Sequence, residues 1–432
     1  MRVHLIGLGG SGVSALAKVY AARGDEVSGC DLIASKTTEL LARSGIRSLV
    51  GHDPEHVSGQ DLVVYSGAAR SAAAEIEEAH RCGIEVLSRA QCLARLIGQQ
   101  RSVAVAGSHG KTTVTLMLGR ILEAAGWDPT ILVGDGGSSR AGSSDWLVAE
   151  ADESDGTLVL HHPQHALVTN VEFDHPDHFA DLDQVRGVFA EFLARLPATG
   201  LAVVCADDPL AAALGTSGRR VTYGFDPSAD WVCRPQAGGG AEVRPPSGGT
   251  MALRLGVPGR HNLQNATGAL AMACELGIPP KVGLESLAGF TGARRRLERL
   301  GQYRGASIFD DYAHHPTEIR AVLEAARALG GERVLAVFQP HRYSRYEAFE
   351  REFGAALSGA DAALVCEIYG AGEPNPRELS SRRLAETIGV DFAPDLAAVG
   401  SWVRSRARPK DVVLLMGAGD LREVGDGLAE RG

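Results

Sequence analysis

The chain lacks the features of a membrane-spanning or disulfide-stabilised protein. Its 432 residues contain no apolar run of about 18 or more, so no segment is expected to insert into a membrane. The opening residues, MRVHLIGLGG, have neither the basic region nor the cleavage site of a signal peptide, which predicts a cytoplasmic location. The seven cysteines are scattered without a C-x-x-C pair, which favours reduced thiols over a disulfide framework or a zinc site.

Positive charge is also in deficit. With 43 Lys and Arg against 53 Asp and Glu, the net charge is −10, which argues against general nucleic-acid binding. An anionic ligand would therefore need locally clustered positive charge, so each lysine or arginine motif carries weight. The composition, 44% hydrophobic and 22% charged, is typical of a globular protein, and the length predicts about three domains. The oligomeric state is not predictable from the sequence.

Apolar strands alternate with helical segments along the whole chain, which predicts an α/β protein with parallel sheets. We expect three units, at residues 1–97, 98–293 and 294–432. Within the second unit, residues 226–256 are rich in Gly, Pro and Arg and predict a loose β-rich insertion with long turns.

The motif AGSHGKTT, residues 106–113, follows directly on an apolar strand. A Gly-rich turn that opens a helix points backbone N–H groups at a phosphate, and the helix dipole adds to the attraction. Lys111 is expected to reach the β- and γ-phosphates, and the Thr112 hydroxyl is expected to bind Mg²⁺. Val105 stands where the strict P-loop pattern has glycine, so the motif predicts a shortened variant of that loop.

Acidic residues and histidines follow the next two strands. Glu150 ends the strand in DWLVAEAD, where nucleotide-binding α/β domains hold Mg²⁺, so we predict a metal role for it. Its neighbours Glu153 and Asp155 are interpreted as solvated loop acids. In TNVEFDHPDHF, residues 169–179, His175 and His178 either bind a metal or cap a loop, and the residues alone leave both readings open.

Polar residues also follow two strands of the third unit, in FDDYAHHPTE and FQPHRYSR. These strand ends carry Asp310, Asp311, His314 and His315, and then His341, Arg342 and Arg345. Strand ends in α/β sheets face the ligand crevice, and a core would not need this many polar groups there. The two motifs therefore predict functional residues.

Two motifs lie near the predicted junction of the second and third units. GRHNLQNA places Asn262 and Asn265 three residues apart on one face of a starting helix. Their amides suit an adenine edge or a phosphate oxygen, and helix capping is the alternative for Asn262. The arginines of residues 294–299 either clamp a phosphate through bidentate bonds or form a solvated face.

The motif GLGGSG, residues 7–12, fits G-x-G-x-x-G after the first strand. By itself it suggests an NAD-dependent dehydrogenase in which Asp31 binds the ribose. Whether the motif binds NAD or another diphosphate-containing ligand depends on the motifs in the rest of the chain.

The motifs GLGGSGVSALA, GSHGKTT, EADESD, TNVEFDH, GRHNLQNA, GARRRLERLG, DDYAHHPTE, FQPHRYSR and GAGD, in this order, resemble the Mur ligase family over nearly the whole chain. The resemblance implies an N-terminal Rossmann-like domain for a UDP-sugar, a central P-loop-like ATPase domain, and a C-terminal Rossmann-like domain that closes over the site. It also implies ligation of L-alanine to the carboxylate of UDP-N-acetylmuramate through an acyl phosphate, with ATP and Mg²⁺ (or Mn²⁺), in cytoplasmic peptidoglycan precursor synthesis.

The same resemblance implies a role for each motif residue. The catalytic set is Lys111, Glu150, His175, Arg296 and Asp311, with Thr112, Glu150 and His175 as metal ligands. ATP is expected at Gly107, Ser108, His109, Gly110, Lys111, Thr112, Thr113, Asn262, Asn265, Arg296 and Asp311. The UDP-sugar is expected at Gly7, Gly9, Gly10, Ser11, Gly12, Asp31, Ser66 and His109, and the acceptor or the closing interface at His314, His315, His341, Arg342 and Arg345.

Three alternatives remain beside this hypothesis. The first is a recycling ligase that joins a murein tripeptide to the same UDP-sugar, and Ala313 is a feature shared with that enzyme. The others are the NAD-dependent dehydrogenase and a non-catalytic nucleotide sensor. The sequence does not choose between L-alanine, glycine and L-serine, does not name the base that deprotonates the amine, and leaves the role of the short Gly/Ser-rich segment 131–146 open.

Overall fold

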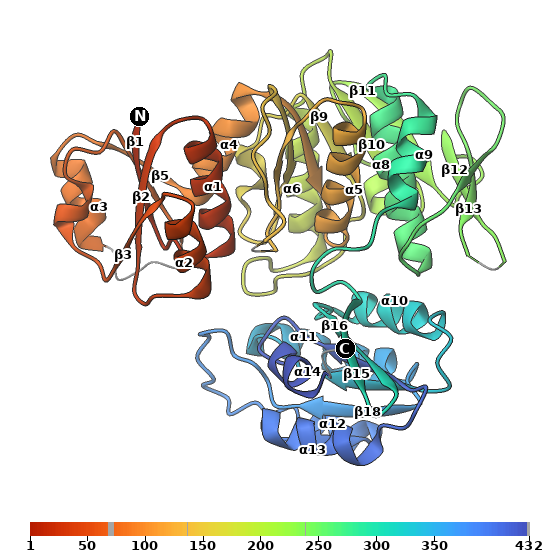
Figure 1. Cartoon of the computed structure of the whole chain (residues 1–432). Helices are drawn as coiled ribbons and strands as arrows, with labels where there is room; N and C mark the ends of the chain where they lie inside the picture. The colour runs from red at the N-terminus through yellow and green to blue at the C-terminus, as the bar shows by residue number, and fades with distance from the viewer. Residues whose placement is uncertain (68–72, 136, 238, 430–432) are drawn as a thin grey trace.

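Three β-sheets follow one another along the chain (Figure 1). This computed structural model describes residues 1–67, 73–135, 137–237 and 239–429. The first two sheets and their helices lie side by side, and the third unit lies below them (Figure 1). The α/β class predicted from the alternating pattern is confirmed, whereas the predicted domain boundaries at 97/98 and 293/294 stay predictions.

The first sheet is parallel, with the order β3-β2-β1-β4-β5. Its elements are β1 (Arg2–Ile6), α1 (Ser11–Ala22), β2 (Glu26–Asp31), α2 (Lys36–Arg43), β3 (Arg47–Val50), η1 (Pro54–Val57), β4 (Leu62–Tyr65), α3 (Ala73–Arg81), β5 (Glu85–Ser88) and α4 (Arg89–Gln99). Side chains alternate across β1: Leu5 packs with α1 and α4, and Ile6 packs on the other face with η1 and α3. The loop after β1 therefore lies beside the end of β4, where the strand order reverses and ligands bind in such sheets.

The second sheet has nine strands, in the order β14-β13-β12-β11-β10-β9-β6-β8-β7. Its strands are β6 (Arg101–Ala106), β7 (Thr130–Leu132), β8 (Trp146–Glu150), β9 (His165–Val168), β10 (Leu201–Cys205), β11 (Arg219–Gly224), β12 (Trp231–Pro235), β13 (Ala241–Arg244) and β14 (Met251–Leu253). Its helices are α5 (Lys111–Ala124), η3 (Thr157–Leu160), α6 (Leu182–Ala194), α7 (Pro209–Ala212), α8 (Arg260–Glu275) and α9 (Pro280–Ala288). The predicted β-rich insertion is confirmed: β12, β13 and β14 pair antiparallel and extend this sheet at its edge.

The third sheet has six strands, in the order β15-β16-β20-β17-β18-β19, and only β15 runs antiparallel. Its strands are β15 (Glu298–Tyr303), β16 (Ala306–Asp311), β17 (Val334–Phe338), β18 (Ala362–Cys366), β19 (Asp391–Ala393) and β20 (Val412–Met416). Its helices are α10 (Pro316–Arg327), α11 (Tyr343–Leu357), α12 (Arg382–Ile388), α13 (Leu396–Arg406) and α14 (Arg422–Leu428). Because parallel strands end at the same edge, the motifs after β16 and β17 meet there.

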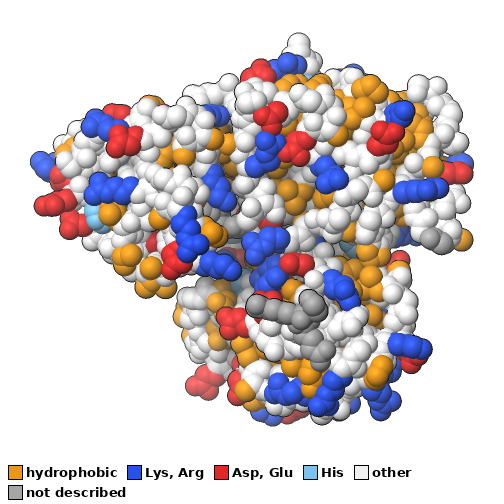
Figure 2. All heavy atoms as spheres, in the orientation of Figure 1, with side chains coloured by type: hydrophobic (Ala, Val, Ile, Leu, Met, Phe, Trp, Pro, Cys, Tyr) orange, Lys and Arg blue, Asp and Glu red, His pale blue; other side chains and the backbone are white. Residues whose placement is uncertain are grey.

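Apolar packing fixes the position of the helix that follows the phosphate-binding motif. Helix α5 packs against α8 and the central sheet through Leu118, Ala269 and Val105, all fully buried. Within the described part of the chain, no helix combines the length and apolar character needed to cross a membrane. Basic side chains gather around the junction between the upper two units and the third (Figure 2).

Candidate active site

The loop between β6 and α5 requires glycine at two positions. Gly107 has φ +141°, and a Cβ there would overlap the side chain of Thr169. Gly110 has φ +84° at the N-cap of α5, and its Cβ would lie 2.9 Å from the Asn265 amide oxygen. The turn therefore brings the start of a 14-residue helix directly behind the loop, which is the geometry of a phosphate site.

The side chain of Lys111 lies in a pocket of oxygen atoms. Its ammonium donates to Glu153 and to the carbonyl of Gly107, each over 2.7 Å. Glu153 is 2% exposed, so its interpretation as a solvated acid is wrong: the loop after β8 turns it inward against Lys111. Burial raises the pKa of Glu153 to about 7 in spite of this ion pair. The interpretation of Asp155 is confirmed, since its side chain is exposed and caps the turn at Thr157.

Carboxylates and an imidazole beside Lys111 fit a divalent cation. Ligand atoms of Asp152, Glu153 and His175 lie within 4.8 Å of one another. One oxygen of Glu153 is buried without a hydrogen-bond partner among the described residues, and burial lowers the pKa of His175, which favours the neutral ligand form. Thr112 donates to Glu150 over 2.9 Å. The predicted ligands thus divide into the pair Thr112–Glu150 and a group that contains His175.

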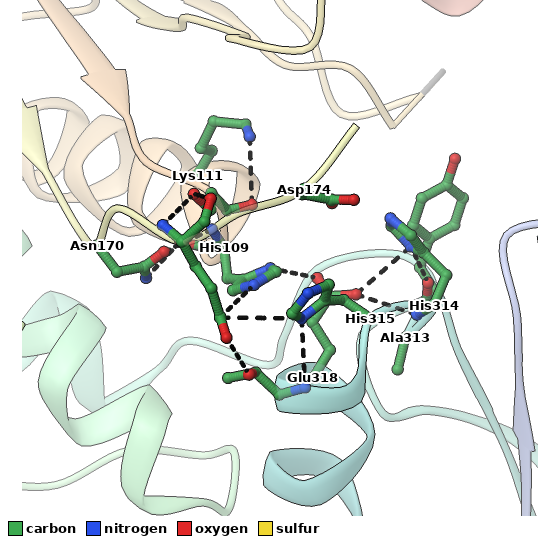
Figure 3. A network of polar contacts seen from close by, with 12 residues as sticks. His109, Lys111, Asn170, Asp174, Ala313, His314, His315 and Glu318 are labelled. Carbon is green, nitrogen blue, oxygen red and sulfur yellow. Dashed lines mark hydrogen bonds and ion pairs between the residues drawn. The ribbon is translucent and has the colours of Figure 1, made fainter. Parts of the chain in front are cut away.

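His109 links the central and C-terminal units (Figure 3). Its Nε2 lies 3.0 Å from Glu172, and its Nδ1 lies 3.3 Å from Glu318 on α10. Burial acts to lower the pKa of His109, but the two carboxylates outweigh it and raise that pKa to about 10. Glu318 also accepts from the Arg296 guanidinium over 3.3 Å, so one buried carboxylate holds two cations from different segments.

A cavity of about 310 Å³ opens between three elements: α8, α10 and the loop 107–110 that joins β6 to α5, which we call the phosphate loop because phosphate binding is predicted there. Of the predicted ATP-binding residues it is lined by His109, Gly110, Thr113, Asn262, Asn265, Arg296 and Asp311. Asn262 donates to the carbonyl of Pro258 over 2.7 Å, which steadies the start of α8 without capping its N–H groups. Burial raises the pKa of Asp311 to about 7 against the attraction of Arg296, while Asp311 accepts N–H bonds from Leu297 and Ala313. The cavity thus collects seven of the eleven residues predicted to bind ATP.

The arginines of residues 294–299 do not act as one clamp. Arg296 lines the cavity, whereas Arg295 turns away and binds Asp310 over 3.1 Å and the carbonyl of Gly417 over 2.7 Å. The backbone at Arg295 is in the left-handed region, with φ +54°, and this local turn directs the Arg295 and Arg296 side chains to different sides. The site therefore receives one of these two neighbouring arginines, and the other fastens the third sheet.

The predicted acceptor residues lie where α10 and α11 meet the loop after β9. Arg345 binds Asp174 over 2.8 Å, and the Arg342 guanidinium pairs with Asp177. His314 and His341 lie with ring centroids 6.1 Å apart, and burial lowers their pKa values to about 3 and about 4. His315 is buried 4.7 Å from the ring of Phe349, and Thr317 beside it donates to Glu172 over 2.7 Å. These contacts join the third unit to the central one.

The Gly-rich loop after β1 forms a second, smaller site. The N–H of Gly9 donates to Asp31 over 2.7 Å, and a Cβ on Gly7 would lie 3.0 Å from that of Ser66, so these four predicted UDP-sugar residues lie together. His109, predicted for the same ligand, lines the larger cavity instead. Gly12 lines a cavity of about 70 Å³ with Arg89. The same cavity is lined by Glu150 and Asp152 of the central unit.

Comparisons with known proteins agree along the whole chain. Three family models match in order: "Mur ligase family, catalytic domain" at residues 2–101, "Mur ligase middle domain" at 105–273, and "Mur ligase, glutamate ligase domain" at 295–419. UDP-N-acetylmuramate–L-alanine ligase from Rubrobacter xylanophilus is 41% identical over 100% of both chains. The ligase of the same name from Kineococcus radiotolerans is 45% identical over 98% of this chain and 94% of its own. The chain belongs to the Mur ligase family.

Solved structures of other Mur ligases share the architecture. The UDP-N-acetylmuramate–alanine ligase of Thermotoga maritima matches with a TM-score of 0.81 and 27% identity, over 99% of this chain and 98% of its own. A murein peptide ligase from Psychrobacter arcticus matches with a TM-score of 0.71 and 25% identity over 100% of both chains. Mur ligases are ATP-dependent, so the chain is an ATP-dependent ligase.

Two residues of this Mur ligase site were missed by sequence reasoning. Glu318 lies inside the motif DDYAHHPTE, but nothing in its spacing indicates that it pairs with His109 and Arg296. Arg89 begins α4, far from any motif, and its side chain would lie 2.7 Å from a Cβ on Gly12. In an acidic chain an anionic ligand needs local positive charge, and Arg89 supplies it beside the Gly-rich loop. Only the fold reveals that Arg89 lies there.

Proposed function

We propose that this Mur ligase joins L-alanine to the carboxylate of UDP-N-acetylmuramate, with ATP and Mg²⁺, during peptidoglycan precursor synthesis in the cytoplasm. One observation carries the proposal: the phosphate loop lies between two cavities. Gly110 and Thr113 line the larger one, while Glu150 and Asp152, which lie beside Thr112 and Lys111, line the smaller one with Gly12. A phosphoryl group at the loop can therefore be reached from a nucleotide on one side and a UDP-sugar on the other.

The chain's own residues account for the first step. ATP would occupy the larger cavity with its γ-phosphate at Lys111 and the start of α5, and the muramate carboxylate would attack that phosphate in line from the smaller cavity. The Asp152–Glu153–His175 group and the Thr112–Glu150 pair would hold Mg²⁺ (or Mn²⁺), which would neutralise charge on the phosphate oxygens. Lys111 is then released from Glu153 to the phosphate and stabilises charge that develops during transfer.

The second step consumes the acyl phosphate. The neutral amine of L-alanine attacks the acyl carbon, a C–N bond forms, phosphate leaves with the electrons of the C–O bond, and the proton lost by the amine passes to the departing phosphate or to water. Water must be kept from the acyl phosphate, and the contacts of His109, Arg345 and Thr317 between the central and C-terminal units close the site on the acceptor side.

The choice of L-alanine over a tripeptide rests on the relatives. Curated ligases named for L-alanine match at 41–45% identity over nearly the full chain, and among the solved structures the alanine ligase matches with a TM-score of 0.81, against 0.71 for the murein peptide ligase. Purified protein with ATP, Mg²⁺ and UDP-N-acetylmuramate should release ADP with L-alanine and yield the corresponding amide by mass spectrometry. Glycine, L-serine and the tripeptide, offered separately, test the selectivity.

Three results would contradict the proposal. Product with the tripeptide alone would identify the recycling reaction, and ATP hydrolysis at the full rate without an amine would remove the ligase mechanism. NAD released on denaturation would support the dehydrogenase. Chelation of divalent cations should abolish ADP release, and Mg²⁺ should restore it.

A further inference from the structure

A buried group of metal-binding side chains lies in the N-terminal unit, outside the ligase site. His4 on β1, Cys30 on β2, His56 on η1 and Glu75 on α3 each offer a ligand atom, and these atoms lie within 4.8 Å of one another. His4, Cys30 and Glu75 are fully buried. The group lies beneath η1 and α3, on the face of the sheet opposite α1 and α4.

The distances between these groups approach those of a tetrahedral site. The Cys30 sulfur lies 3.3 Å from a Glu75 oxygen, and His56 Nδ1 lies 2.8 Å from that carboxylate. Zinc–nitrogen and zinc–sulfur bonds of ordinary length set neighbouring ligands about 3.3–3.6 Å apart. To surround an ion, the Cys30 contact would widen by up to about 0.3 Å and the His56 contact by about 0.5–0.8 Å, and the other ligand atoms, which lie within 4.8 Å of one another, would draw closer.

Hydrogen bonds outside the group orient its members. Ser28 bonds His4 Nδ1 over 2.9 Å, and His52 and the N–H of Asp53 bond the Glu75 carboxylate over 2.9 and 3.2 Å. Such outer bonds fix the tautomer and direction of metal ligands. The bond to Ser28 leaves His4 Nε2 buried and without a hydrogen-bond partner among the described residues. Hydrogen bonding within the group therefore leaves this nitrogen unsatisfied, whereas a bound metal ion would satisfy it.

From this arrangement we propose that His4, Cys30, His56 and Glu75 bind one Zn²⁺, which fastens η1 and α3 to β1 and β2. A thiolate with imidazoles and a carboxylate suits zinc and not the Mg²⁺ of phosphate chemistry. Of the candidate metal-binding groups among the described residues, this one alone contains a thiol. Sequence spacing disfavoured a zinc site because its four ligands come from four separate elements. The site is independent of the proposed ligase function.

Cobalt provides a direct test, because Co²⁺ replaces Zn²⁺ and a thiolate ligand adds a near-ultraviolet charge-transfer band. The full-length protein is stripped with a chelator, its fold is checked by circular dichroism, and Co²⁺ is titrated in. We expect the charge-transfer band and the intense visible bands of tetrahedral Co²⁺ to saturate at one ion per chain. Added Zn²⁺ should displace them. Co²⁺ in the oxygen-rich ligase site has no thiolate and adds no such band.

Three variants decide the outcome. Cys30→Ser should lose the charge-transfer band, and His56→Ala should keep Cys30 but weaken Co²⁺ binding by about tenfold or more. Cys82→Ser removes an exposed cysteine of the same unit and should leave the spectrum unchanged. Zn²⁺ should raise the melting temperature of wild type and of Cys82→Ser, and at the same Zn²⁺ concentration should raise that of His56→Ala by less. Absence of the band in wild type, or its survival in Cys30→Ser, would overturn the proposal.

Discussion

The Arg345 guanidinium and the Asp174 carboxylate form an ion pair at 2.8 Å, and the two side chains are 3% and 4% exposed. Arg345 lies on α11 of the third unit, and Asp174 follows β9 of the central one, 171 residues away in the chain. His175, a candidate metal ligand, lies 3.4 Å from the same guanidinium. This buried pair thus joins the C-terminal unit to the central one directly beside a candidate metal ligand.

Replacing Arg345 should therefore affect stability and turnover together. Arg345→Ala leaves Asp174 buried without its cation, which costs about 3–5 kcal/mol of unfolding free energy. Denaturant unfolding and steady-state kinetics measure the two effects. Arg377→Ala removes an exposed arginine that pairs with Glu347 in the same unit, and should change stability by less than about 1 kcal/mol. Equal losses of unfolding free energy in the two variants would show that the buried pair stabilises the protein no more than an exposed pair does.

Acid should weaken the same pair. Burial alone would raise the pKa of Asp174, but the positive charge of Arg345 outweighs burial and holds that pKa well below its usual range. A depressed carboxylate pKa contributes stability above the unfolded pKa of about 3.9, and that stability is lost as the pH falls through the folded pKa. The stability difference between wild type and Asp174→Asn should stay constant from about pH 5 to 8 and shrink below about pH 4. A difference that instead grows in acid would contradict the assignment.

Lys111 should be required for phosphoryl transfer. Lys111→Met should lower turnover by a factor on the order of 10³ or more, because a charge on the transferring group is lost. The substitution also leaves Glu153 buried without its cation, which should destabilise the fold. The double variant Lys111→Met with Glu153→Gln removes that unpaired charge, so it distinguishes a loss of turnover from a loss of stability. We expect the double variant to regain stability but not turnover. Lys281→Met, on the surface of α9, serves as the matched control. Turnover of Lys111→Met within about tenfold of wild type would move the phosphate site elsewhere.

His109 should stabilise the protein most at neutral and lower pH. Its pKa is raised to about 10 by Glu172 and Glu318, from about 6.5 in the unfolded chain. A raised histidine pKa contributes stability that is complete below about pH 6.5 and is lost as the pH rises through the folded pKa. The unfolding free energy of wild type minus that of His109→Gln should therefore decline steadily from pH 6.5 to 10. A flat difference over that range would show that His109 is neutral.

Arg342 tests the contribution of the third unit to catalysis. It pairs with Asp177 after β9 and lies 3.7 Å from Glu373, so it contacts the central unit without lining the nucleotide cavity. Arg342→Ala should lower turnover by about fivefold, as expected for the loss of a partly exposed pair worth up to about 1 kcal/mol. ATP affinity by calorimetry should stay unchanged, and Arg383→Ala on α12 is the surface control. Weak ATP binding with normal turnover at saturation would place Arg342 in the nucleotide site instead.

Several features of this ligase follow from local sequence alone. Strand–turn–helix chemistry is local, so the phosphate loop after β6, the Gly-rich loop after β1 and the polar ends of β16 and β17 could be identified from neighbouring residues. The alternating pattern likewise predicted the α/β class, and the Gly, Pro and Arg content of residues 226–256 predicted a β-rich insertion, whose antiparallel pairing only the structure shows. These features depend on backbone conformation over a few residues, which residue type largely determines.

Only the tertiary structure decided how these pieces meet. It turned Glu153 inward onto Lys111, divided Arg295 from Arg296, and made Glu318 the partner of His109. It also gathered Cys30 with three side chains from other elements, although the spacing of the cysteines disfavoured a metal site. The reason is physical: burial and pairing depend on which elements the fold brings together, and residues tens to hundreds of positions apart carry no local sign of that.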